Sequence, residues 1–297
     1  MEEKIISRFA SLFHEKGERF EIVNNTIFSL YNGMVVPFGP VKEKADLTTD
    51  QAKELLKKLG GRLVRWNEGD FEFSGNPEWY TLICRNFISL DDVKSKLRNE
   101  IRKGISNCGV KQVDAEYISN YGYEVYSKAY GRYRNNRQNI VDREAFSREM
   151  ISYSNYQDLM QFWGVYYGNK LIAYSSNYIF YPTEVLYTSI KIDPEWLHMN
   201  PSYALIYTMN KYYLSDNGFE YANDGYRTLL HETNFQSFLI KNFGFIKAGL
   251  QLKVHYKPIY SLIINGLYPV RKIAGKVDPR LEAVLKLEKI RRSFNEA

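Results

Sequence analysis

The stretch HMNPSYALIYTMNKYYLSDNG, residues 198–218, decides which fold the rest of the chain is expected to build. Asn200 and Pro201 precede a long apolar run, and a Ser-Asp-Asn-Gly sequence follows it. Asn is typical of a helix N-cap and Pro of the first helical position, so a helix over 201–215 is predicted. Its start can bind an anion through the backbone N–H groups of Ser202, Tyr203 and Ala204. Ordinary capping explains the same residues, and both interpretations stay open here.

Predicted strands lie on both sides of this helix in the sequence. Three strands with turn signals between them precede it, at residues 162–169, 170–181 and 183–193. It is followed by a strand, a helix and a last strand, at residues 219–225, 232–242 and 249–257. Further upstream the pattern predicts a short strand and two helices, at residues 109–117, 120–137 and 142–154.

The first hundred residues predict a smaller set of elements. An Asn-Gly pair within residues 26–39 indicates a β-hairpin. Thr48 and Gln51 form a capping box for a helix over 47–61. Two strands and a helix that begins at Ser89 and carries a basic face follow, at residues 61–66, 78–87 and 89–105. The tail, 258–297, predicts two further helices.

Composition limits the classes of protein that the chain can belong to. Its 297 residues are 44% hydrophobic and 25% charged, which is typical of a folded protein, and its net charge is +6. Cys84, Cys108 and four scattered histidines form no disulfide framework and no metal-binding motif. No apolar run is long enough to predict a membrane span, and the first residues do not resemble a signal peptide. We therefore expect a cytoplasmic protein without a metal.

Several segments together resemble a known family. The segments KLRNEIRKGISNCGVKQVDAEY, GVYYGNKLIAYSSNYIF, HMNPSYALIYTMNKYYLSDNGFEYANDG and HETNFQSFLIKNFGF resemble the GNAT acyltransferases, and in particular their tandem, Fem-like group of acyl and aminoacyl transferases. The resemblance implies an α+β fold, with a mixed sheet flanked by helices in two GNAT-like domains. It divides the chain into an N-terminal α+β domain, a GNAT-like acyltransferase domain and a helical tail, at residues 1–90, 91–257 and 258–297.

The resemblance also implies where a cofactor binds. The family's pyrophosphate loop corresponds to Met199–Ala204, where Ser202, Tyr203 and Ala204 are implied to contact the phosphates of an acyl-coenzyme A. Only Ala204 fits the family pattern, so a weaker or altered phosphate grip is expected. The strand before the loop is implied to pair with the pantetheine arm through Ile190 and Ile192, and Asn234 is implied to contact the cofactor. Ile240 stands where the family often has a tyrosine that acts as general acid.

The general base has to come from local chemistry. Acyl transfer to an amine needs a group that accepts a proton, and His231, Asp224 and Glu232 are the candidates, with His231 first because its pKa lies near neutral. Arg227 is a candidate for binding a substrate carboxylate or phosphate. Tyr187 and Ser189 are substrate-binding candidates, because they alternate with Lys191 along one predicted face of a strand.

Three functions follow from these residues. The first is an N-acyltransferase that moves an acyl group from acetyl-CoA or another acyl-CoA to a small-molecule or peptide amine. The second is a Fem-type transferase that uses an aminoacyl-tRNA and acts on a peptide; the basic helix over 89–105 and the altered loop favour it. The third is a GNAT-like module that binds a ligand without catalysis. The sequence does not indicate the acceptor, the acyl chain or the oligomeric state.

Overall fold

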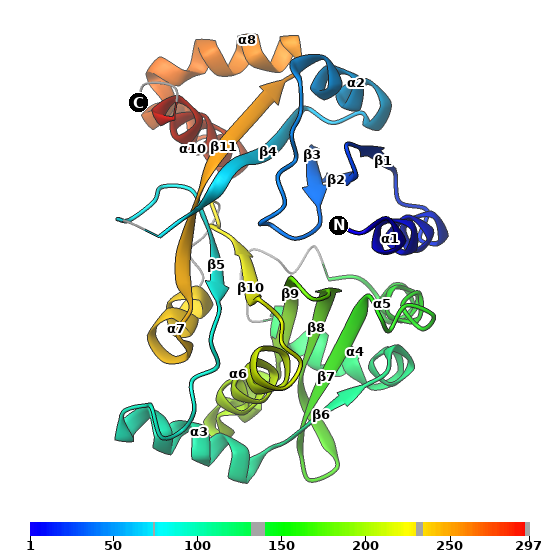
Figure 1. Ribbon diagram of the computed structural model, residues 1–297, viewed down its shortest axis with the longest axis vertical. Helices are drawn as coiled ribbons and strands as arrows, with labels where there is room; N and C mark the ends of the chain where they lie inside the picture. Colours follow the sequence, from blue (N-terminus) through cyan, green and yellow to red (C-terminus); the bar gives the residue numbers. More distant parts are fainter. Residues whose placement is uncertain (74, 132–139, 230–233, 295–297) are drawn as a thin grey trace. The chain divides into compact units, whose positions relative to one another are not determined.

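The computed structural model describes residues 1–297 except 74, 132–139, 230–233 and 295–297. The described chain forms two compact units (Figure 1). The first contains Met1–Leu82, Tyr226–Ser237 and Ile246–Ala297, and the second contains Ile83–Gly225 and Phe238–Phe245. Strand β5 (Tyr80–Cys84) leads from the first unit into the second, strand β10 (Tyr221–Tyr226) leads back, and α7 (Asn234–Phe243) contributes residues to both.

The first unit is a mixed sheet covered on both faces. Its strands lie in the order β1-β2-β3-β4-β11, with bounds Phe20–Val23, Thr26–Tyr31, Met34–Phe38, Leu63–Glu72 and Ile246–Tyr256. The pairing is antiparallel except between β3 and β4. Neighbouring residues of β4 point to opposite faces: Val64 belongs to the core with α2 (Thr49–Leu59), and Leu63 to the core with α10 (Pro279–Ser293). The remaining helices of this unit are α1 (Glu3–Glu15), α8 (Pro258–Leu267) and α9 (Arg271–Ala274).

The second unit is also a helix-covered mixed sheet. Its strands lie in the order β10-β9-β8-β7-β6, where β9 to β6 span Glu184–Ile192, Lys170–Phe180, Met160–Tyr167 and Gly109–Val113. The pairing of β10 with β9 is parallel, and the others are antiparallel. The helix α6 covers one face, and α4 covers the other with α5 beside it (Figure 1). These helices span Pro201–Asn210, Ala115–Gly131 and Arg143–Ile151.

Most predicted elements are confirmed. The hairpin at 26–39 is β2 and β3, and the capping box of α2 forms with both of its hydrogen bonds. The predicted helix over 201–215 is α6, which continues as a π-helix over Lys211–Asp216. The expected fold class, a mixed sheet flanked by helices, is likewise confirmed.

The predicted start of the basic helix at Ser89 is wrong. The helix α3 spans Ser95–Asn107, six residues later, because the Ser89 hydroxyl closes a local turn instead. That hydroxyl donates to Asp92 at 2.7 Å and accepts from the backbone N–H of Asp91 at 3.2 Å. Arg98 then binds three backbone carbonyl groups of the turn, at Leu90, Asp91 and Val93.

The compact units are interleaved in sequence. The strand β11 pairs with β4 over most of its length, so the end of the chain belongs with its beginning, and α10 completes the core of the first unit. A division into consecutive segments at 1–90, 91–257 and 258–297 therefore separates residues that pack together. The assignment of these three segments as domains remains a prediction.

Candidate functional site

The strands β9 and β10 of the second unit part from one another beyond a short paired section. Their parallel register runs from Tyr221 opposite Glu184 to Asn223 opposite Leu186. The strand β9 continues to Ile192 while pairing with β8, and β10 continues through Asp224 and Gly225 to Tyr226. Because the carboxyl ends of parallel strands are the usual place for ligands in open sheets, this opening is the candidate active site.

A β-bulge in β9 lies at this opening. Ser189 pairs with Ser176, but Tyr187 pairs with Asn177, so Thr188 is the extra residue. Thr188 is exposed, and the predicted cofactor contacts Ile190 and Ile192 follow it as partly exposed residues. The bulge leaves this half of β9 accessible to an extended ligand.

The bulge also changes which side chains share a face. Tyr187 and Ser189 were predicted on one face, and this is wrong, because an extra residue reverses the alternation. Tyr187 lies on the α6 side, where its hydroxyl donates to Asn210 at 2.8 Å. Ser189 shares the α4 side with Lys191, whose Nζ lies 4.6 Å from the ring centre of Tyr130.

The Tyr187 hydroxyl is held in its protonated form. Burial raises the pKa of Tyr187 well above its ordinary value, and the neighbouring Tyr213, Cys84 and Asp224 raise it further. The Asp224 carboxylate therefore lies within electrostatic reach of a buried hydroxyl. Tyr187 is only 4% exposed, so its side chain belongs to the core beside α6.

A buried carboxylate fixes the paired end of β9 and β10. Glu184 is fully buried and accepts hydrogen bonds from the Tyr221 hydroxyl at 2.7 Å and the Asn223 amide at 2.8 Å. The other end of the Asn223 amide accepts from the Gly225 N–H at 2.7 Å. Gly225 has a φ of 85°, which favours glycine, and its hydrogen bond to Asn223 fixes the backbone on either side of Asp224. Sequence reasoning missed Glu184, since a charged residue beside a Pro-Thr turn resembles an exposed one.

The start of α6, the predicted phosphate site, is largely occupied by the protein itself. Pro201 has no N–H, and the N–H groups of Tyr203 and Ala204 both donate to the Asn200 carbonyl, at 3.1 and 3.3 Å. Among the three predicted contacts, this leaves the N–H and hydroxyl of Ser202, which is partly exposed.

A carboxylate from α3 lies beside this helix start. Glu100 accepts from the Asn200 side-chain amide at 2.6 Å, and the same carboxylate, together with burial, raises the pKa of Tyr203. The close approach occurs at Gly104, where an added Cβ would lie 2.6 Å from the Asn200 carbonyl oxygen. Since a carboxylate repels phosphate, Glu100 disfavours phosphate at this helix start; weak or altered phosphate binding there stays a prediction.

The other predicted residues belong to the first unit or lie outside the described chain. His231 and Glu232 lie in the segment 230–233, which the structure does not describe. Arg227 and Asn234 belong to the first unit. There the Arg227 guanidinium donates to the Glu78 carbonyl at 2.6 Å, and Asn234 is exposed at the first residue of α7.

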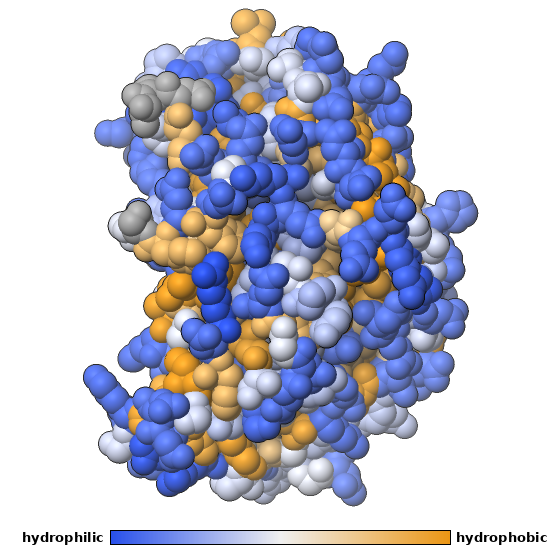
Figure 2. Space-filling view, in the orientation of Figure 1, coloured by the Kyte–Doolittle hydropathy of each residue, from blue (hydrophilic) through white to orange (hydrophobic). Residues whose placement is uncertain are grey.

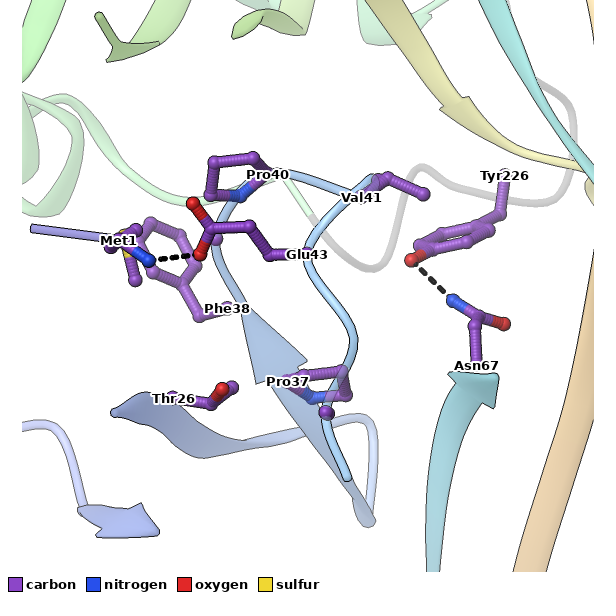
Figure 3. Close-up of a pocket in the computed structure, with 11 residues that line it drawn as sticks. Met1, Thr26, Pro37, Phe38, Pro40, Val41, Glu43, Asn67 and Tyr226 are labelled. Atoms are coloured by element: carbon purple, nitrogen blue, oxygen red, sulfur yellow. Dashed lines mark hydrogen bonds and ion pairs between the residues drawn. The ribbon is translucent and has the colours of Figure 1, made fainter. Parts of the chain in front are cut away.

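The first unit has a hollow of its own beside β2, β3 and β4 (Figure 3). It encloses about 360 Å³ that is open to solvent. Asn67 and Tyr226 lie at one side, joined by a 2.7 Å hydrogen bond, and the terminal ammonium of Met1 pairs with Glu43 at the other. The Asn67 side chain also accepts from Trp79 at 2.8 Å, so these polar groups are already engaged with the protein.

Two further features are absent from the part of the chain that the structure describes. No three His, Cys, Asp or Glu side chains there are grouped so that they could hold a metal ion. The same residues include no helix with the length and apolar character needed to cross a membrane.

Comparison with solved structures identifies the fold. The chain is similar to FemX, with a TM-score of 0.54 and 12% identity over 86% of this chain and 93% of FemX. It is also similar to the C-terminal domain of a protein from Agrobacterium fabrum described as a lysylphosphatidylglycerol synthetase, with a TM-score of 0.51, 10% identity, and coverage of 86% and 90%. No protein-family profile and no curated protein matches the sequence. The chain has a GNAT-like, Fem-like fold.

Proposed function

We propose that this protein is an N-acyltransferase that moves an acyl group from an activated donor to an amine. The observation that carries the proposal is the opening in the second unit: beyond the section in which β9 and β10 pair, β9 has a bulge followed by partly exposed residues, and Asp224 is the next residue of β10. An extended donor arm can pair with the β9 edge, as a strand pairs with a sheet. The similarity in fold to FemX, over 86% of this chain, supports the proposal, because the sequence resembles the Fem-like transferases.

The proposed reaction is a direct transfer. The amine nitrogen attacks the acyl carbonyl carbon, a C–N bond forms, and the C–S or C–O bond to the donor breaks with its electron pair leaving on sulfur or oxygen. The amine loses one proton, and we propose Asp224, which follows the paired section of β10, as the residue that accepts it. Such general-base assistance typically contributes about 10²–10⁴-fold to the rate. His231 and Glu232 remain sequence-based alternatives for this role.

Two donors are compatible with this reaction. Acyl-CoA is the donor expected from the family resemblance. The start of α6 favours an aminoacyl-tRNA instead, because its Tyr203 and Ala204 N–H groups already donate to the Asn200 carbonyl and the Glu100 carboxylate binds the Asn200 side chain beside them. The exposed cations at and after the N-cap of α3, at Lys94, Lys96, Arg102 and Lys103, supply positive charge for a polyanionic donor.

The test is a transfer assay that pairs each donor with each acceptor class. Acetyl-CoA, long-chain acyl-CoA and alanyl-tRNA, each labelled in the acyl group, are incubated with small amines and with lysine- or alanine-ended peptides. We expect labelled amide product, and an Asp224→Asn variant about 10²–10⁴-fold slower. Asp216→Asn, which changes an exposed ion pair with Lys211, is the matched control and should keep its rate. The proposal fails if no pair gives product and no donor binds.

Binding measurements with tRNA and with coenzyme A distinguish the two donors. Complex formation with tRNA should weaken steeply between 50 and 200 mM salt, by roughly 10³-fold or more if several phosphates are contacted. If Ser202→Ala leaves the affinity for coenzyme A unchanged, the start of α6 does not belong to the cofactor site. Binding of coenzyme A together with no binding of tRNA would exclude the aminoacyl donor.

A further inference from the structure

The segment from Lys257 to Val277 joins exposed aliphatic side chains with positive charge. Its sequence, KPIYSLIINGLYPVRKIAGKV, contains four Lys or Arg residues and no Asp or Glu. It begins with α8, continues through a short 3₁₀ turn at Tyr268–Val270, and includes α9. We call it the apolar-basic segment.

The helix α8 is apolar on both of its sides. The inward side anchors it: Ile264 is 5% exposed, and the Arg62 guanidinium lies 5.9 Å from the ring centre of Tyr260. On the outward side, aliphatic residues at spacings of three and four stay in contact with solvent, with exposures of 60%, 71% and 44% at Ile259, Leu262 and Ile263. A helix that is apolar on all sides is normally buried, so the outward side of α8 is expected to contact another apolar surface.

The aliphatic surface continues beyond α8 with cations beside it. Val270, Ile273 and Val277 are 50%, 72% and 82% exposed. Lys272 and Lys276 are exposed in the same stretch. Figure 2 shows hydrophobic atoms reaching the surface over α8, at the upper edge of the view.

The positive charge of the segment indicates which kind of partner binds to its exposed aliphatic side chains. A second copy would place its own cations against these, and such an arrangement is repulsive. A protein groove would cover the aliphatic residues but would not by itself use the two exposed cations, Lys272 and Lys276. An anionic lipid surface satisfies both, because aliphatic side chains enter the boundary between head groups and acyl chains while lysines remain at the charged head groups. The ten residues of α8 suit a helix that lies on a bilayer.

We infer that the apolar-basic segment docks the first unit onto an anionic membrane surface. Leu262, Ile263 and Ile273 enter the interface, and Lys272 and Lys276 contact the lipid head groups. The inference is independent of the proposed transferase activity, since it concerns residues of the first unit alone and its readout is membrane binding.

The test is co-sedimentation of the full-length protein with vesicles. Vesicles of phosphatidylcholine with about 30% phosphatidylglycerol should bind the protein, and vesicles of phosphatidylcholine alone should bind it much more weakly. Each basic residue near such a surface contributes about 1 kcal/mol, so Lys272→Gln with Lys276→Gln should weaken binding about 30-fold. Leu262→Ser with Ile273→Ser should weaken it at least about tenfold on both kinds of vesicle.

Matched controls separate docking from general charge and from folding. Lys4→Gln with Lys57→Gln removes two exposed cations from α1 and α2 of the same unit and should leave vesicle binding unchanged. The substituted residues of the segment are exposed, so all variants should keep the wild-type thermal midpoint. Equal binding by the wild type and both docking variants would overturn the inference. The inference would also be overturned if the protein did not bind anionic vesicles. Self-association or tRNA binding through the segment, without vesicle binding, is one such outcome.

Discussion

Replacing Gly104 with alanine tests how closely α3 packs on the start of α6. Glycine to alanine inside a helix normally stabilises a protein by about 0.5–1 kcal/mol. Here the new Cβ would lie 2.6 Å from the Asn200 carbonyl oxygen and 3.0 Å from the Ala204 nitrogen. Ordinary contact begins near 3.4 Å, and both atoms belong to the backbone, so one helix has to move by about 0.8 Å. Overpacking of this kind costs about 1–3 kcal/mol, and destabilisation should prevail.

The assay is urea denaturation and thermal melting of the purified variant. The thermal midpoint should fall by about 2–4 °C for each kcal/mol lost. Gly266→Ala is the matched control, because that glycine lies in α8 with open space around its Cβ position, and it should be neutral or stabilising. A Gly104→Ala protein as stable as the Gly266→Ala protein would refute the close packing and reopen the start of α6 as an anion site.

Three further predictions concern buried groups. Tyr187→Phe should lower the free energy of unfolding by about 1–3 kcal/mol, because the Asn210 oxygen loses its donor, whereas Tyr181→Phe at an exposed position should not; equal effects in urea denaturation would contradict this. Burial alone would raise the pKa of Glu288, but hydrogen bonds from two arginines lower it more, so its folded pKa is depressed. The stabilisation by the Glu288 carboxylate is present above the unfolded pKa and is lost as the pH falls through the folded pKa. Glu288→Gln should therefore lower the free energy of unfolding by about 3 kcal/mol at neutral pH and leave it unchanged at strongly acidic pH. A difference in thermal midpoint that does not depend on pH would refute this. Burial raises the pKa of the Cys84 thiol to about 12, so iodoacetamide near pH 8 should label it only after unfolding, and labelling of the native protein seen by mass spectrometry would contradict its burial.

Local features of the sequence located most helices and strands correctly. The capping box of α2, the Asn-Gly hairpin of β2 and β3, and the Asn-Pro start of α6 each depend on residues within one turn of each other. Ser89 shows the limit of such reasoning. A serine can cap a helix or close a turn with the same hydroxyl, and the choice depends on Arg98, which binds the turn's carbonyl groups from inside the helix.

The candidate site shows where prediction from the sequence ended. The strands at 170–181, 183–193 and 219–225 could be placed, but the prediction that Asp224 ends its strand is wrong, because β10 continues to Tyr226. The face that Tyr187 occupies could not, because a single bulge residue, Thr188, reverses the alternation on which face predictions depend. Glu184 and Asn210 were missed for a similar reason, since their burial depends on strands and helices distant in the sequence.

By itself, the sequence determined the kind and order of elements, since capping, turns and hydrophobic periodicity act over a few residues. It also carried the combination of aliphatic and basic residues at 257–277. Only the tertiary structure decided that β11 returns to pair with β4, that the bulge opens the β9 edge, and that α3 closes the start of α6. Each of these depends on contacts between residues far apart in the chain. Their energies depend on packing distance, so a one-residue shift or a missing Cβ decides whether a helix start binds a ligand or a neighbouring helix.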